Sequence, residues 1–216
     1  MDKLTLVIAN RNHSSWSLRP WLALKVAGIP FSEKTILLDR PETRDEIGMV
    51  SPSGWIPCLL VGRKPIWDSL AICEYAAETF PDNNLWPADK WARAIARSVT
   101  AEMHSGFRSL PGGLRMNITA RLPTPDLASE KLGQDVARLL QIWRDCRSEF
   151  GRGGPFLFGA FSIADAYFAP IVTRFETYSV PVGPVERAYM DAIWSLDAMQ
   201  EWKAAAVAEI AAQASA

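Results

Sequence analysis

Short apolar runs and helix-spaced apolar residues alternate along the first third of the chain. Residues 4–9 form a run rich in β-branched side chains, which predicts a buried strand. A polar loop, RNHSS, follows this run. The pattern after the loop has helical spacing and stops at Gly28 with Pro30 just beyond, as at a helix end. Its apolar residues are Leu18, Trp21, Leu22 and Val26.

Three further strand-like stretches and a second helix complete this first unit. Residues 31–38 are typical of a strand, and the polar stretch up to residue 50 is irregular or weakly helical. Residues 57–61 and 65–67 suit two strands that flank a turn at Gly62 and Arg63. From Asp68 onwards, apolar residues with helical spacing continue to Phe80. This order of elements predicts a small mixed sheet covered by helices.

The segment PDNNLWPAD separates two kinds of pattern. Two prolines and two asparagines in so short a stretch are typical of a connector. We therefore expect an α/β unit over residues 1–80, a linker over residues 81–90 and an all-helical unit over residues 91–216. The helix-spaced apolar residues of the second unit are Ile95, Val99, Met103 and Phe107; Leu132, Val136, Leu139, Leu140, Trp143 and Phe150; and Ala164, Phe168, Ile171, Val172 and Phe175.

Composition and charge are those of an ordinary globular protein. Of the 216 residues, 49% are hydrophobic and 22% are charged. A chain of this length buries roughly 70% of the surface that its unfolded form exposes, so it needs no disulfide or structural metal to fold. The 23 basic and 24 acidic residues leave a net charge of -1. Nucleic-acid-binding proteins usually carry a basic excess, so this class is disfavoured.

Cysteine and histidine are both scarce. The three cysteines lie far apart without a CxxC pair, which favours a reducing compartment over a secreted disulfide framework. The two histidines, His13 and His104, give no zinc-ligand spacing. The first apolar run is too short for a signal peptide, and no run approaches the roughly 18 residues of a membrane span. We expect a soluble, cytoplasmic protein that binds no metal.

The polar loop over residues 10–17 is the first candidate site. It leads directly into a helix amino terminus, where free N–H groups and the helix dipole favour an anion. The hydroxyls of Ser14 and Ser15 are able to donate to a thiolate or an oxyanion there. The alternative is that a loop serine only caps the helix, and Ser17, inside the first turn, is the expected cap.

Two short segments before a strand and before a helix are further candidates. If the peptide bond of Pro57 is cis, the peptide group of Ile56 is free to pair with an added peptide; the alternative is an edge-strand proline without a ligand. Asp68 and Ser69 suit a helix N-cap. The same geometry lets Ser69 and the helix N–H groups hold a carboxylate while Asp68 holds an ammonium group.

The segment FSIAD carries a helix-start signal in the second unit. Ser162 and Asp165 have the spacing of a capping box, with Asp in place of the more common Glu. We assign these two residues a role in folding rather than in catalysis.

Together these segments resemble the cytosolic glutathione transferases over nearly the whole chain. The resemblance is carried by SSWSLRPWLALKVAGIPF, the Ile-Pro pair, the Asp-Ser pair and FSIAD, in that order and at the family's spacing. The first segment is most similar to serine-type, zeta-like bacterial members. The resemblance implies a thioredoxin-like α/β domain followed by an all-α helical domain, with glutathione as co-substrate and no metal.

The same resemblance implies which residue contacts the glutathione sulfur. In serine-type members, a loop serine donates a hydrogen bond to the thiolate, whose parent thiol has a free pKa of about 8.5. Ser14, and then Ser15, is favoured for this role. If Arg19 is aligned with the second arginine of the zeta-like pattern S-x-x-x-x-R-x-R, Asn12 takes the place of the serine and its amide is the donor.

The other glutathione contacts implied by the family lie further along the chain. Ile56, before the family's cis-proline at Pro57, pairs through its backbone with the cysteinyl part, and Asp68 and Ser69 hold the γ-glutamyl end. Trp55 stands where zeta-like members often have a polar side chain, so it stacks on the ligand or covers it. No cysteine occupies the loop, which disfavours the thiol-transfer chemistry of omega- and beta-like members.

The function implied by the resemblance is that of a homodimeric glutathione transferase, which directs the thiolate at a small hydrophobic electrophile. The electrophile is expected between the loop and the first helix of the second unit. The side chains there are more often core than pocket residues, and they are Met103, His104, Phe107 and Arg108.

Two alternative functions remain open. Isomerisation of maleylacetoacetate requires cationic groups that hold a dicarboxylate, for which Arg11, Arg108 and Arg115 are available. A non-catalytic binding module would keep the fold and lose glutathione. The Ile-Pro and Asp-Ser pairs argue against the module, because both serve mainly the ligand.

Overall fold

A four-stranded mixed sheet forms the centre of the first unit in the computed structural model, which describes residues 2–128 and 130–214. The strand order is β2-β1-β3-β4. β1 (Leu4–Ile8) pairs in parallel with β2 (Ser32–Thr35) and antiparallel with β3 (Cys58–Val61), and β3 pairs antiparallel with β4 (Lys64–Ile66). The predicted mixed sheet is confirmed, with strands slightly shorter than the apolar runs suggested.

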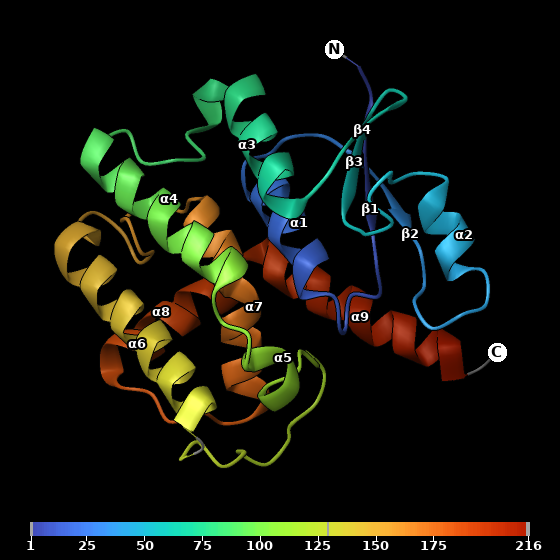
Figure 1. The fold of residues 1–216 in the computed structure, drawn as a ribbon. Coiled ribbons are helices and arrows are strands. Elements are labelled where there is room, and N and C mark those ends of the chain that lie inside the picture. Colours follow the sequence, from blue (N-terminus) through green and yellow to red (C-terminus); the bar gives the residue numbers. More distant parts are fainter. Residues whose placement is uncertain (1, 129, 215–216) are drawn as a thin grey trace.

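Side chains that alternate along β1 face two separate cores. Leu6 and Ile8 belong to the main core of the protein, whereas Val7 packs with Ile47 and Cys58 in a small second cluster. This follows from the two-residue period of a strand. The main core lies on the side of α1 (Ser15–Val26) and α3 (Ser69–Thr79), and the short helix α2 (Thr43–Gly48) covers the other cluster (Figure 1).

A helical unit follows a single 3-10 turn over Pro81–Asn83. Within it, 14 of the 15 residues of α7 (Ile163–Thr177) are buried, and a helix buried nearly all round needs other elements on every side. The other helices of this unit are α4 (Lys90–Ser105), α5 (Leu110–Gly113), α6 (Glu130–Phe150), α8 (Pro184–Trp194) and α9 (Asp197–Ala214). α7 packs against α1 of the first unit and against α4 and α8 of its own unit (Figure 1).

The capping box predicted at the start of α7 is present. The Asp165 carboxylate accepts hydrogen bonds from the Ser162 backbone N–H at 2.8 Å and from the Leu157 backbone N–H at 3.0 Å, so it also anchors the preceding loop. Asp165 is fully buried, and burial raises its pKa to about 6, although these N–H groups favour the charged form.

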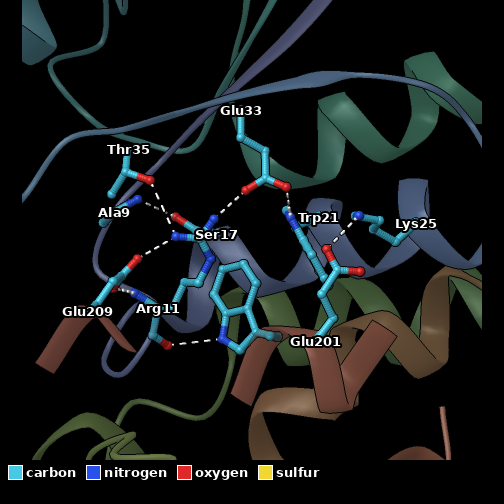
Figure 2. Close-up of polar contacts among 10 residues, drawn as sticks. Ala9, Arg11, Ser17, Trp21, Lys25, Glu33, Thr35, Glu201 and Glu209 are labelled. Carbon is cyan, nitrogen blue, oxygen red and sulfur yellow. Dashed lines mark hydrogen bonds and ion pairs between the residues drawn. The ribbon is translucent and has the colours of Figure 1, made fainter. Parts of the chain in front are cut away.

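The last helix returns to the first unit and is fixed there by polar contacts (Figure 2). Arg11 in the loop after β1 forms ion pairs with Glu33 of β2 and with Glu209 of α9. The indole N–H of Trp202 donates to the Arg11 carbonyl at 3.0 Å, and its ring lies against that of Trp21 with centroids 4.9 Å apart. The loop before α1 is therefore held by the carboxyl-terminal helix.

Replacing Asp165 tests the anchoring of α7. Asp165→Ala leaves the buried N–H groups of Leu157 and Ser162 without their acceptor, so we expect a loss of about 2–4 kcal/mol in unfolding free energy by urea titration. Asp89→Ala, at the exposed N-cap of α4, is the control and costs only about 1 kcal/mol. Equal losses in the two variants contradict the anchoring role.

Replacing Trp202 tests the contact between α9 and the first unit. Trp202→Ala opens a cavity beside Trp21 and removes the hydrogen bond to the Arg11 carbonyl, so we expect a loss of about 3–5 kcal/mol. The matched control is Trp91→Ala, because Trp91 is 62% exposed and its loss should change stability by less than about 0.5 kcal/mol. Thermal melts of both variants give the comparison.

Candidate functional site

A cavity of about 340 Å³ lies where the loop before β3 and the amino terminus of α3 approach the helical unit. It brings together all five residues that the sequence assigned to glutathione and one that it assigned to the electrophile. Trp55, 78% exposed, stands at its rim. The full lining is Trp16, Ser53, Trp55, Ile56, Pro57, Trp67, Asp68, Ser69 and His104.

A second, smaller hollow of about 150 Å³ adjoins this cavity. Trp16 and His104 line both, so the two spaces are adjacent and these two side chains, whose ring centroids lie 5.3 Å apart, stand between them. All four residues predicted for the electrophile line the second hollow. Its lining is Ser15, Trp16, Arg19, Met103, His104, Ser105, Phe107, Arg108, Pro111 and Arg174.

Ser14, rather than Ser17, is the N-cap of α1. The Ser14 hydroxyl accepts from the Ser17 backbone N–H at 3.3 Å and donates to the Ser17 hydroxyl at 2.8 Å, and Ser17 in turn accepts from the Ala9 backbone N–H at 3.0 Å. The expected cap at Ser17 was wrong, because the helix begins one residue after Ser14 and the cap precedes the first turn. Ser14 lines neither hollow.

Asn12 ties the loop to the helical unit. Its amide nitrogen donates to the Asn117 side chain at 3.0 Å, and its amide oxygen accepts from the backbone N–H of Thr119 at 3.2 Å and from the Thr119 hydroxyl at 3.1 Å. Asn12 is buried and lines neither hollow. Its donor and acceptor are thus both engaged in joining the two units.

Ser15 is the loop serine that faces the second hollow. It is the first residue of α1, and its hydroxyl oxygen accepts a hydrogen bond from the Arg174 guanidinium of α7 at 3.2 Å. A hydroxyl that accepts one bond still carries a hydrogen to donate. Of the three sulfur-donor candidates, Ser15 therefore combines a position on the hollow with a free donor.

The Ile56–Pro57 peptide bond is cis, which settles the condition that the sequence left open. Trp55 precedes this pair, and its backbone N–H donates to the Ser53 hydroxyl at 3.2 Å. The Trp67–Asp68 peptide bond at the other side of the cavity is cis as well.

Asp68 and Ser69 cap α3 and line the cavity at the same time. One Asp68 carboxylate oxygen accepts from the backbone N–H of Leu70 at 2.9 Å, and the other lies 3.0 Å from Nε2 of His104 in α4. The Ser69 hydroxyl lies 2.8 Å from the Tyr167 hydroxyl of α7. The structural and ligand interpretations of this pair are compatible, since capping uses only part of its hydrogen-bonding capacity.

Among the residues at this site that were not assigned from the sequence are Trp16, Arg19, Tyr167 and Arg174. The Arg19 guanidinium lies between the rings of Trp16 and Tyr167, with its central carbon 4.1 Å and 4.7 Å from the ring centroids. Burial lowers the pKa of both Arg19 and Arg174 to about 10. An arginine four residues after Ser15 points to the same helix face, which could have singled out Arg19; Arg174 has no such local signal.

Other kinds of site find no support in the part of the chain that the structure describes. Across residues 2–128 and 130–214, no cluster of three or more histidine, cysteine or acidic side chains has a metal-binding arrangement. None of the helices described there is long and apolar enough to span a bilayer.

Known protein families match the α/β unit and the helical unit of this chain separately. The family model for the glutathione S-transferase N-terminal domain matches residues 13–79, and that for the C-terminal domain matches residues 126–206. A probable maleylacetoacetate isomerase of Caenorhabditis elegans is 36% identical over 100 residues, which cover 46% of this chain and 46% of that protein. This match thus spans about half the length of the curated relative.

Solved structures share the fold along nearly the whole chain. A glutathione transferase homolog from Burkholderia, solved with bound glutathione, has a TM-score of 0.69 at 24% identity and covers 93% of this chain and 95% of its own. A bacterial maleyl pyruvate isomerase of the zeta class has a TM-score of 0.72 at 23% identity, covering 93% and 97%. With both domain models matched, the chain belongs to the glutathione S-transferase family and is similar to its zeta-class members.

Proposed function

We propose that this protein binds glutathione in the larger cavity and directs its thiolate at an electrophile in the second hollow. The observation that carries the proposal is the junction of the two spaces at Trp16 and His104. A tripeptide in the first space can present its sulfur at this junction to a reactant in the second. Holding two reactants in this way supplies much of the rate enhancement of a bimolecular reaction.

The cavity offers a suitable group for each end of glutathione. The amino terminus of α3 presents the Ser69 backbone N–H and hydroxyl to the γ-glutamyl carboxylate, whereas Asp68 caps the N–H groups of Leu70 and Ala71. The Asp68 carboxylate, which is about half exposed, is available for the ammonium group. The backbone of Ile56 lines the same cavity and serves the cysteinyl part as an added strand.

Ser15 is the sulfur donor in this proposal, in preference to Ser14 and Asn12. The Ser14 hydroxyl already donates to Ser17, and the Asn12 amide is held by Asn117 and Thr119. Neither lines the cavity or the second hollow, whereas Ser15 lines the second hollow. Among the residues that the structure describes, none accepts a hydrogen bond from the Ser15 hydroxyl, so its hydrogen can point at the thiolate.

The second hollow supports two substrate classes. Met103 and Phe107 supply an apolar wall, which suits a small hydrophobic electrophile and favours conjugation. Arg108 lines the same hollow and suits a carboxylate-bearing electrophile, as in the isomerase alternative. Of the other cations considered, Arg11 is paired with Glu33 and Glu209 and lines neither hollow.

Glutathione binding is tested by Ser69→Ala. Loss of a hydrogen bond to a charged carboxylate should weaken affinity by about 1.5–3 kcal/mol, or roughly 10- to 150-fold in Kd by calorimetry. Tyr167→Phe is the matched control, because it removes only the protein partner of Ser69 and should change Kd less than about threefold. An unchanged Kd in Ser69→Ala rejects the assignment, and a folded wild type without affinity for glutathione favours a non-catalytic module.

The substrate class is tested with Arg108→Met. Assays with a halonitroarene report conjugation, and assays with maleylacetone report isomerisation. We expect the halonitroarene rate to change little, whereas the KM for maleylacetone rises about tenfold or more, since the carboxylate loses a charged partner. An equal effect on both substrates shows that Arg108 shapes the hollow without selecting charge.

A further inference from the structure

Two buried guanidinium groups lie at the second hollow without an acidic partner. Arg19 is 3% exposed and Arg174 is 7% exposed. Neither forms an ion pair with any residue within the described ranges. Nε and Nη1 of Arg19 and Nε of Arg174 have no hydrogen-bond partner there either.

Such an arrangement is unfavourable for the fold. A buried charge is costly unless it is paired, and two like charges repel each other. The main cause of the lowered pKa of Arg174 is its burial, and the charge of Arg19 lowers this pKa further. The rings of Trp16 and Tyr167 stabilise Arg19 only partly, because a cation–π contact is weaker than an ion pair in the same surroundings. The two unpaired guanidinium groups therefore favour the binding of an anion at this site.

Ser15 lines the second hollow beside these two arginines and precedes Trp16, which lines both spaces. Its hydroxyl accepts from Arg174 at 3.2 Å and keeps one hydrogen for a further acceptor. A hydroxyl polarised by a cation is a better donor than an isolated one. Ser15 also opens α1, whose amino terminus adds a partial positive charge.

We propose that Arg19 and Arg174 hold bound glutathione as its thiolate, with Arg174 acting through Ser15. This inference rests on the proposed function. The S–H bond breaks, its electron pair stays on sulfur and the proton leaves to solvent water. The Ser15 hydroxyl then donates to the sulfur anion while Arg174 donates to Ser15. Arg19 contributes charge only, and Arg174 is a positioning residue.

Other charged and titratable groups surround the site, and none of them duplicates this role. Asp68, from the start of α3, has its oxygens directed at the α3 backbone and at His104. His104 and Arg108 line the hollow from α4 and the segment after it, and Tyr167 faces Arg19 from α7. The Cys73 thiol of α3 also acts on Arg19, and Tyr178 at the end of α7 acts on Arg174, so these two groups complete the set of titratable neighbours.

The decisive measurement is the ultraviolet thiolate absorbance of the glutathione complex across pH. We expect Arg174→Met to raise the pKa of the bound thiol by one unit or more, which lowers the ratio of thiolate to thiol at least tenfold at a given pH. Arg174→Lys keeps the charge and should restore most of the shift. Arg121→Met, at an exposed arginine paired with Glu176, is the control and should titrate like wild type.

Two further readouts separate this role from a structural one. Arg174→Met removes a buried unpaired charge, so its Tm should equal or exceed that of wild type, whereas a structural arginine lowers Tm when removed. In the double variant Ser15→Ala/Arg174→Met, the pKa shift should fall short of the sum of the single shifts, because the two residues act in series. Arg19→Met should shift the same pKa additively with Ser15→Ala.

The outcomes that overturn the inference are distinct from failure of the proposed function. If wild type binds glutathione and Arg174→Met leaves the thiol pKa unchanged, the arginines do not activate sulfur. A rise only in KM for a carboxylate electrophile would then assign them to that substrate. If wild type does not bind glutathione in calorimetry, the proposed function itself fails and the inference falls with it.

Discussion

The packing of α1 against α7 is the contact on which the rest of this structure depends. α1 follows the central strand β1, yet nine of its twelve residues are buried, because α7 and α9 cover it from the helical unit while the sheet and α3 cover it from its own. The two units therefore share one core. The same packing brings Ser15, Trp16 and Arg19 beside Tyr167 and Arg174.

A consequence is that the candidate site lies on the boundary between the units, and its polar residues also join them. Asp68 meets His104, Ser69 meets Tyr167, and Ser15 meets Arg174 across this boundary. In the proposed function, ligand binding and the relative placement of the units are thus linked through the same hydrogen bonds. Asn12 and the Arg11 contacts to α9 fix the loop from outside the cavity, so the start of α1 is held even without a ligand.

Capping explains why some residues fit both a structural and a functional interpretation. Asp68 caps the N–H groups of Leu70 and Ala71 at the amino terminus of α3, which leaves the Ser69 N–H for the carboxylate of the proposed ligand. In contrast, the Ser14 hydroxyl accepts from the Ser17 N–H as the helix cap and donates to the Ser17 hydroxyl. Ser15 is therefore the loop serine that lines the hollow. A capping preference in the sequence therefore pointed to the loop beside the second hollow without identifying the residue that lines it.

The sequence by itself determined the mixed sheet, the helical second unit, the capping box at Ser162 and Asp165 and the segments that line the cavity. The sheet, the helices and the capping box follow from periodicities and from contacts within three or four residues, which neighbouring side chains fix locally, whereas the cavity segments came from the family resemblance together with capping signals. It left open the choice among Asn12, Ser14 and Ser15, and it gave no sign of Arg174. That arginine meets Ser15 across 159 positions, and only the packing of α1 on α7 decides such a contact, because burial and long-range pairing have no local signature.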